Sequence, residues 1–182
     1  MKRLLRVVLA LVLGLLLLGP VSAAQAAAPY CGIRWGSLPR NVPAMSMDAS
    51  LTNVRTGRHA CFDRMVLDVR GDIRGYDVRY TTQVHQEGSG FVVPLRGGAK
   101  LAVVARVPAY DENGRATYRP ANPRELRNVT GYRTFRQLAW AGTFEGQSTV
   151  GLGVRARLPF RAFIVDGPGS GSRLVVDVAH RW

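Results

Sequence analysis

The sequence predicts an all-β fold, a single-domain and mostly antiparallel β-sandwich with one short helix in a long loop. Short apolar segments recur between Gly- and Pro-containing turns, at the spacing typical of an all-β domain. Within several of these segments apolar and polar residues alternate, as in strands that bury one face. Beyond residue 26 no stretch keeps an apolar period of 3.6 residues.

Eight or nine strands account for most of the chain. The clearest covers residues 62–69, where Met65, Leu67 and Val69 share one face. A weak strand at 51–54 precedes it. The others follow in chain order, at 76–81, 91–95, 101–107, 135–143, 149–158, 160–165 and 173–180.

One helix is expected, inside the polar stretch 109–133. The segment NPRELRNV, residues 122–129, places Asn122 as an N-cap, Pro123 at the first helical position and Glu125 at the third. These are the residue types that helix starts favour.

The first 26 residues predict a secretory signal peptide. A basic start precedes the apolar run 7–18, and Gly19-Pro20 and a small-residue pattern ending at Ala26 follow it. The alternative is an uncleaved membrane anchor, but the run is shorter than the roughly 20 residues that span a bilayer. We therefore expect cleavage near Ala26, a secreted or extracytoplasmic product and no stable membrane span after cleavage.

The rest divides into two parts. Residues 27–47 carry three prolines and no periodicity, which predicts an extended N-terminal arm. Residues 48–182 predict the sandwich domain. The two cysteines, Cys31 and Cys61, predict a disulfide that fastens the arm to the first core strand, since an even pair in an exported chain is usually bridged.

Basic residues dominate the charge. The formal net charge is +13, and loss of Lys2, Arg3 and Arg6 with the signal peptide lowers it to +10. Such a chain is attracted to polyanions. Outside the cell these are cell-wall polymers, acidic glycans or lipid head groups, and no nucleic-acid partner is expected.

One hexapeptide occurs almost twice. RMVLDV, residues 64–69, returns as RLVVDV, residues 173–178. In each copy Arg and Asp share a strand face but lie roughly 13 Å apart, too far to pair within one strand. They could pair across strands if the copies are neighbours or are related by a pseudo-twofold axis, although any half-buried strand could have this pattern.

Several stretches resemble the AMIN-like domain of exported actinobacterial proteins and lipoproteins. They are WGS (35–37), VRTGRHACFDRMVLDVRG (54–71), GYDVRY (75–80), FEGQSTVGLGV (144–154) and RLVVDVAH (173–180). That family is similar to the AMIN domain, a small β-sandwich that directs envelope proteins to peptidoglycan. The resemblance implies a cell-envelope compartment and two equivalent Arg-led core strands. It implies no defined activity.

Signatures of catalysis are scarce. The three histidines, His59, His85 and His180, have no metal-ligand spacing, and no nucleophile elbow or paired-carboxylate signature occurs. We therefore expect no enzyme activity, no catalytic residue, no metal site and no cofactor.

The best binding candidate is RTGRHACFDR, which gathers Arg55, Arg58, His59, Asp63 and Arg64 around a glycine turn. Guanidinium groups bind carboxylates and phosphates. The alternative is a structural turn in which Asp63 accepts hydrogen bonds.

Trp35, in the arm, is an additional candidate that could stack on a sugar ring. The sequence thus favours an exported, non-catalytic envelope module that binds peptidoglycan or an acidic glycan through an arginine-rich edge. A module that holds an envelope protein at an exposed sheet edge is the alternative. The oligomeric state stays open.

Overall fold

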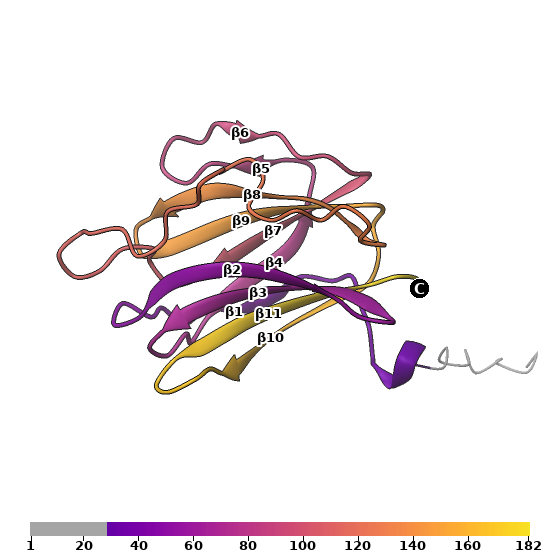
Figure 1. Cartoon of the computed structure of the whole chain (residues 1–182), viewed down its shortest axis with the longest axis horizontal. Helices are drawn as coiled ribbons and strands as arrows, with labels where there is room; N and C mark the ends of the chain where they lie inside the picture. Colours follow the sequence, from indigo (N-terminus) through magenta and orange to yellow (C-terminus); the bar gives the residue numbers. More distant parts are fainter. Residues whose placement is uncertain (1–28) are drawn as a thin grey trace, which may run out of the picture.

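A computed structural model describes residues 29–182, in which two antiparallel sheets face each other (Figure 1). The all-β prediction is confirmed. The elements are the 3-10 turn η1 (Tyr30–Gly32) and the strands β1 (Arg40–Val42), β2 (Ser50–Arg58), β3 (Phe62–Arg70), β4 (Tyr76–Thr81), β5 (Val84–His85), β6 (Val92–Val93), β7 (Ala99–Ala105), β8 (Phe135–Phe144), β9 (Gln147–Val154), β10 (Phe160–Asp166) and β11 (Ser172–Ala179).

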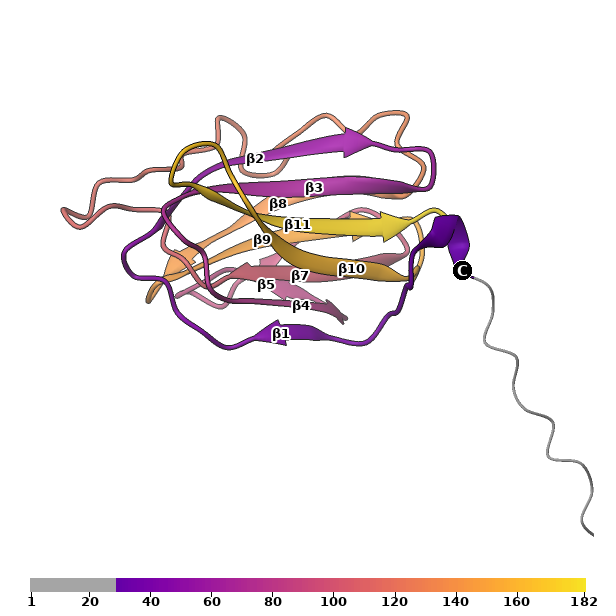
Figure 2. The same ribbon diagram turned by 90° about the horizontal axis from the view of Figure 1, so that it is seen from below.

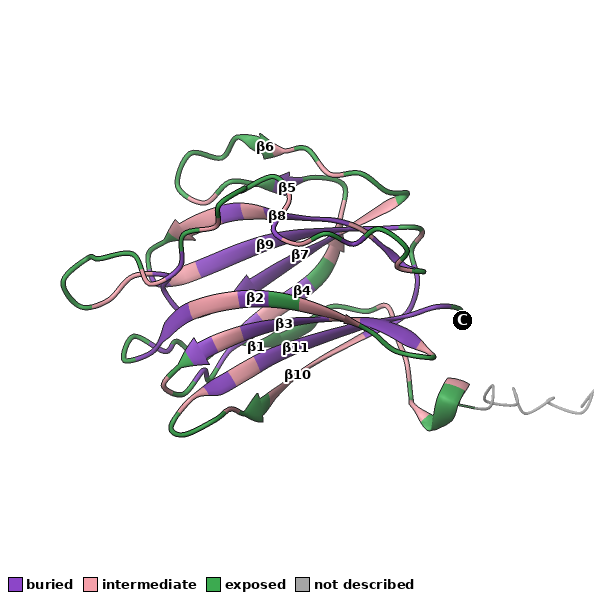
Figure 3. Ribbon diagram, in the orientation of Figure 1, coloured by how far each residue is buried: buried purple, intermediate pink, exposed green. Residues whose placement is uncertain are grey.

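The five-stranded sheet has the order β1-β4-β7-β9-β8, and the four-stranded sheet has the order β10-β11-β3-β2. Their facing sides form the main core, and Figure 3 shows the central strands mostly buried and the connecting loops mostly exposed. Met65 and Leu67 of β3 are fully buried, as their alternation predicts, and Val69 nearly so. Full burial of such a side chain contributes about 1.5–3 kcal/mol.

The hairpin β5-β6 covers the outer face of the five-stranded sheet and forms a smaller apolar cluster there. Two glycines of β9 permit this close approach. A Cβ atom on Gly153 would lie 1.9 Å from the carbonyl oxygen of Arg96, and one on Gly151 would lie 2.8 Å from the Leu95 side chain. The glycines therefore leave room for the segment that follows β6.

The expected helix at 122–129 is absent. Asn122 instead caps a turn, its side-chain oxygen accepting from the backbone N–H of Arg124 at 3.0 Å. The backbone then pairs with β8, with Leu126 N–H donating to Leu138 O and Trp140 N–H donating to Pro123 O. Because these groups bond across to the sheet edge, the helical i→i−4 bonds do not form.

The described part of the arm, residues 29–47, runs along the sandwich (Figure 2). It contains η1 and β1, and β1 pairs antiparallel with β4, placing Asn41 opposite Asp77. No apolar alternation marks residues 40–42, so sequence reasoning did not find this strand.

Two tyrosines of β4 link the sheets. Tyr76 Oη donates to Ala162 O at 2.9 Å, and Tyr80 Oη donates to Leu158 O at 2.6 Å. The Leu158 N–H in turn donates to Tyr80 Oη at 3.0 Å. Tyr80 therefore ties β4 to the segment that leads into β10.

The buried phenol of Tyr80 should make stability fall in alkali. Burial raises the pKa of Tyr80 from 10.0 to about 12, although the hydrogen bond to Leu158 and the charge of Arg157 oppose the shift. The folded-state pKa exceeds the unfolded one, so this stability is present below pH 10.0 and is lost as pH rises toward about 12. We expect Tyr80→Phe to flatten the fall in Tm over that window, measured by circular dichroism. Parallel Tm curves for the two proteins would contradict this assignment.

Candidate functional site

The two copies of the repeated hexapeptide are neighbouring antiparallel strands, β3 and β11. Val66 lies opposite Val175, Arg64 opposite Asp177, and Asp68 opposite Arg173. A pseudo-twofold axis between the two valines thus relates the copies. The repetition serves a cross-strand pairing on the outer face of the four-stranded sheet.

At one end of this face Arg64, Asp177 and Arg161 form a row of paired charges, which we call the closed row. Asp177, whose side chain is 0% exposed, accepts two hydrogen bonds from Arg64, at 2.6 and 2.9 Å, and one from Arg161 of β10 at 2.7 Å. The hydrogen bond to Asp177 raises the pKa of Arg64 above its ordinary value. Two guanidinium groups therefore satisfy one buried carboxylate.

Aromatic rings cover this row. The guanidinium carbon of Arg161 lies 5.5 Å from the centre of the Trp35 ring and 5.4 Å from that of Phe62. Arg64 lies 5.2 Å from the Phe62 ring. Trp35 is half-buried and donates from Nε1 to Tyr30 O at 2.9 Å. The arm thus closes the row with an aromatic side chain.

At the other end Arg55, Asp68 and Arg173 form a second row of charges, which is more exposed to solvent and which we call the open row. Arg55 of β2 donates to both carboxylate oxygens, at 2.7 and 2.9 Å, and this raises the pKa of Arg55. Asn53 donates to Asp68 Oδ2 at 3.4 Å. Arg173 lies 3.5 Å away and makes an ion pair without a hydrogen bond.

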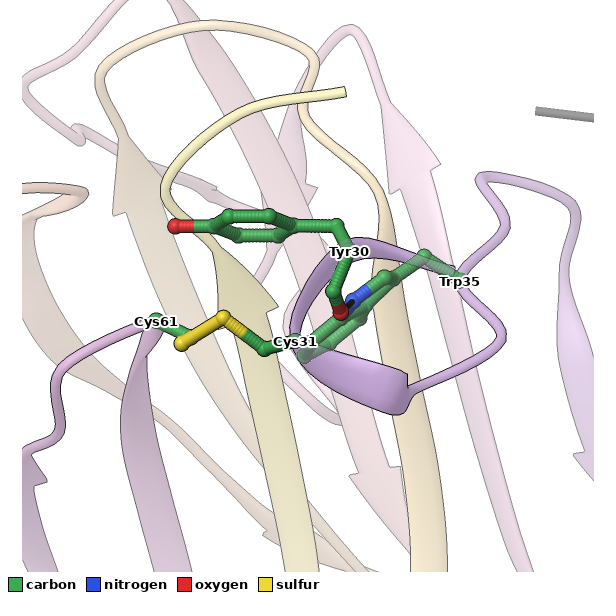
Figure 4. The surroundings of a disulfide bond; sticks show 4 residues. All are labelled: Tyr30, Cys31, Trp35 and Cys61. Carbon is green, nitrogen blue, oxygen red and sulfur yellow. Dashed lines mark hydrogen bonds between the residues drawn. A yellow bond between two sulfur atoms is a disulfide. The ribbon is translucent and has the colours of Figure 1, made fainter. Parts of the chain in front are cut away.

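The predicted disulfide is present. Cys31 and Cys61 are bridged, with their Cα atoms 6.4 Å apart, and Figure 4 shows the bond beside Tyr30 and Trp35. Cys61 directly precedes β3, so the bridge fastens the arm to the first residues of that core strand.

Asp63 points into the protein and joins the two sheets. Its Oδ2 accepts from the backbone N–H groups of Thr134 at 2.5 Å and Phe135 at 3.1 Å, where β8 begins. Its Oδ1 lies 3.2 Å from Nε2 of His180, which is also buried. The Asp63 carboxylate therefore holds the ends of β3, β8 and β11 together.

Five connecting segments meet at this end of the sandwich, where η1 and the C-terminus lie (Figure 2). His180 N–H donates to Cys61 O, Arg155 N–H donates to Thr134 O, and the Arg155 side chain donates to His180 O. The segments 29–37, 57–61, 131–134, 155–159 and 180–182 contain no Asp or Glu. They carry six arginines, which we call the basic end: Arg34, Arg58, Arg133, Arg155, Arg157 and Arg181.

The structure divides the six candidate residues between four places. Arg55 and Arg64 lie in separate charge rows, Trp35 covers one row, and Asp63 is buried. Arg58 and His59 are exposed at the β2–β3 turn, within the basic end.

The other arginines of the basic end were missed. They come from segments far apart in the chain, and no local spacing marks them. Only the scarcity of acids in those segments could have indicated the group.

A second surface feature is a hollow of about 660 Å³ beside β6 and β8, with half-buried Trp140 in its wall. Trp140 packs edge-on against Tyr118. Pro94, Pro123 and Arg124 also line the hollow.

Within residues 29–182, no three His, Cys, Asp or Glu side chains cluster as metal ligands would. No helix in that range is long and apolar enough to cross a membrane. The predicted signal peptide and its cleavage near Ala26 fall outside the described residues.

Comparison with known proteins gives one match. The family model of the AMIN-like domain matches residues 49–180. No curated protein matches the chain, and no solved structure matches it.

Proposed function

The chain belongs to the AMIN-like domain family, and on that basis we propose that it is an exported, non-catalytic module of the cell envelope. It binds an anionic cell-wall polymer, peptidoglycan or an acidic glycan. The contact is an arginine-rich edge centred on the β2–β3 turn, at the basic end of the sandwich.

The observation that carries this proposal is the absence of acids from the basic end. Six arginines from five segments lie at one end of the domain, and the nearby Asp63 carboxylate is buried. The opposite end carries a mixture of charges, including Asp48, Asp72 and Arg74. A surface on which positive charge predominates attracts a polyanion from a distance and orients the domain on it.

Arg58 and His59 are the residues of the predicted cluster that a polymer can contact at this end. Both are exposed, and the Arg58 guanidinium lies 6.0 Å from the Tyr132 ring centre. Asp63 is buried, and its carboxylate is directed to Thr134, Phe135 and His180. Arg55 and Arg64 contribute positive charge, but their hydrogen bonds are already directed to Asp68 and Asp177.

The test is co-sedimentation of the purified domain with isolated cell-wall sacculi at low and high salt. Arg34→Gln, Arg58→Gln and Arg133→Gln together remove three exposed charges from the basic end. Each such contact contributes about 0.5 kcal/mol, so the combined variant should bind roughly tenfold more weakly. Binding of the unmodified domain should weaken with salt, because salt screens exposed charges.

A variant with the same net charge is the control. Arg115→Gln, Arg119→Gln and Arg124→Gln remove three exposed arginines from the long loop between β7 and β8. This variant should bind as the unmodified domain does. If both variants bind the sacculi equally weakly, net charge and not the basic end accounts for binding. If salt does not weaken the binding of the unmodified domain, the arginine mechanism is contradicted.

A protein-interaction module is the second candidate, and one observation favours it. β10 is the outermost strand of the four-stranded sheet. Within the part of the chain that the structure describes, only Phe160 at the start of β10 pairs outward, with Gly36. A partner could add a strand along the rest of β10. A protein that remains bound after glycan digestion would favour this candidate.

A further inference from the structure

A cavity of about 500 Å³ lies at the open charge row, under the loop between β10 and β11. It is at the end of the sandwich opposite the basic end. Its polar lining includes Thr52, Arg55, Asp68, Arg70, Ser170 and Arg173.

The pseudo-twofold axis provides an internal comparison for this cavity. It exchanges the closed row around Asp177 with the open row around Asp68. In the closed row Arg64 donates two hydrogen bonds to its aspartate. In the open row the side chain of its counterpart Arg173 donates none, and its buried Nε atom, 3.5 Å from Asp68 Oδ1, has no hydrogen-bond partner among the described residues.

The exposure of the two aspartates differs in the same way. The Asp177 side chain is 0% exposed beneath Arg64 and Arg161, whereas the Asp68 side chain is 23% exposed. Among the described residues no aromatic side chain lines the cavity, whereas Trp35 covers the closed row. The open row thus lacks a cover that its symmetry mate has.

The cavity carries a net positive charge, and two of its three arginines are not hydrogen-bonded to its one carboxylate. Arg55 donates two hydrogen bonds to Asp68 and so occupies the carboxylate of the cavity. Arg70 and Arg173 also line the cavity. Within residues 29–182 neither the Arg70 side chain nor the Arg173 side chain donates a hydrogen bond. A guanidinium group presents paired N–H donors that match the two oxygens of a carboxylate.

We propose that this cavity binds the free carboxylate at the end of a short peptide, with Arg70 and Arg173 as its donors. Asp68, 3.5 Å from Arg173, positions that guanidinium group. Because the net charge of the cavity is positive, it attracts a phosphate as well as a carboxylate, and the shape of the wall beside Arg173 has to favour the peptide. Pro168, Ser170 and Gly171 form a wall of small residues that suits a compact terminal side chain. The site goes beyond the proposed function, since it lies away from the basic end.

The test is three NMR titrations of the isotope-labelled domain. The ligands are acetyl-alanyl-alanine, which has a free carboxylate, the same dipeptide with a C-terminal amide, and glycerol phosphate. The free acid should shift the backbone amide signals of residues 169–173 in a saturable way, and the C-terminal amide should not. Arg173→Gln and Arg70→Gln should each weaken binding about tenfold, as expected for loss of about 1.4 kcal/mol. Arg115→Gln, on the protruding loop, should leave it unchanged.

Several outcomes would overturn the proposal. These are equal shifts with the amide, binding of glycerol phosphate at least as tight as that of the peptide, and unchanged affinity in both arginine variants. Spectra of the variants that match the unmodified domain outside the cavity establish that they are folded. The variant of the basic end, with Arg34, Arg58 and Arg133 replaced, should bind the peptide as the unmodified domain does. The peptide titration therefore tests this cavity independently of the proposed binding of cell-wall polymer.

Discussion

Replacing Asp63 by alanine is expected to lower the free energy of unfolding by about 3–5 kcal/mol, as removal of one member of a buried polar pair does. The carboxylate accepts from two backbone N–H groups at the start of β8 and lies against buried His180. Alanine would leave all three groups buried without their partner. Each unpaired donor costs about 1–3 kcal/mol.

Equilibrium unfolding in urea, followed by circular dichroism, measures this effect. Asp72→Ala is the matched control, because its side chain is 68% exposed and its contact is a surface ion pair with Arg74. That change should stay within about 0.5 kcal/mol. Similar losses for the two variants would show that Asp63 does not hold the sheets together.

Removing the disulfide, with Cys31→Ser and Cys61→Ser together, is expected to cost about 3–4 kcal/mol. The bridge joins residues separated by 30 positions and so restricts the unfolded chain. In the folded state the arm would lose its attachment near β3, and Trp35 would lose part of the support for its position over Arg161.

Urea unfolding with and without a reductant tests this expectation. The unmodified protein should lose the same stability on reduction that the double variant lacks, and the variant should not respond to reductant. Tryptophan fluorescence should report the release of the arm, while far-ultraviolet circular dichroism stays that of a sandwich. Unchanged unfolding midpoints under both conditions would contradict the stabilising role.

Alternation and turn residues were sufficient to predict the larger strands. β3, with Met65 and Leu67 facing the core, was found at nearly its full length. β2 was predicted only as 51–54, because its second half is polar and is held by pairing with β3. The expected helix failed for a related reason, since Leu126 bonds to β8 and that contact has no local signal.

The candidate site was less predictable than the fold. Arg55, Arg58 and Arg64 are close in sequence, but the pleat and the hairpin turn direct them to different partners. The ion pair between Arg64 and Asp177 joins residues 113 positions apart. The repeated hexapeptide predicted an Arg–Asp pair across strands only if its two copies were neighbours, and the sequence alone does not show that they are. The basic end and the cavity near Arg173 depend on loop positions that only the assembled sheets define.

The symmetry of β3 and β11 also has a consequence for assembly of the fold. Each strand reads Arg-x-Val-x-Asp, so it is complementary to an antiparallel copy of itself as well as to its native neighbour. Two unfolded molecules that align their β3 segments would place Arg64 of each opposite Asp68 of the other. We therefore expect pairing between chains to compete with refolding, and dilution to favour the native sandwich.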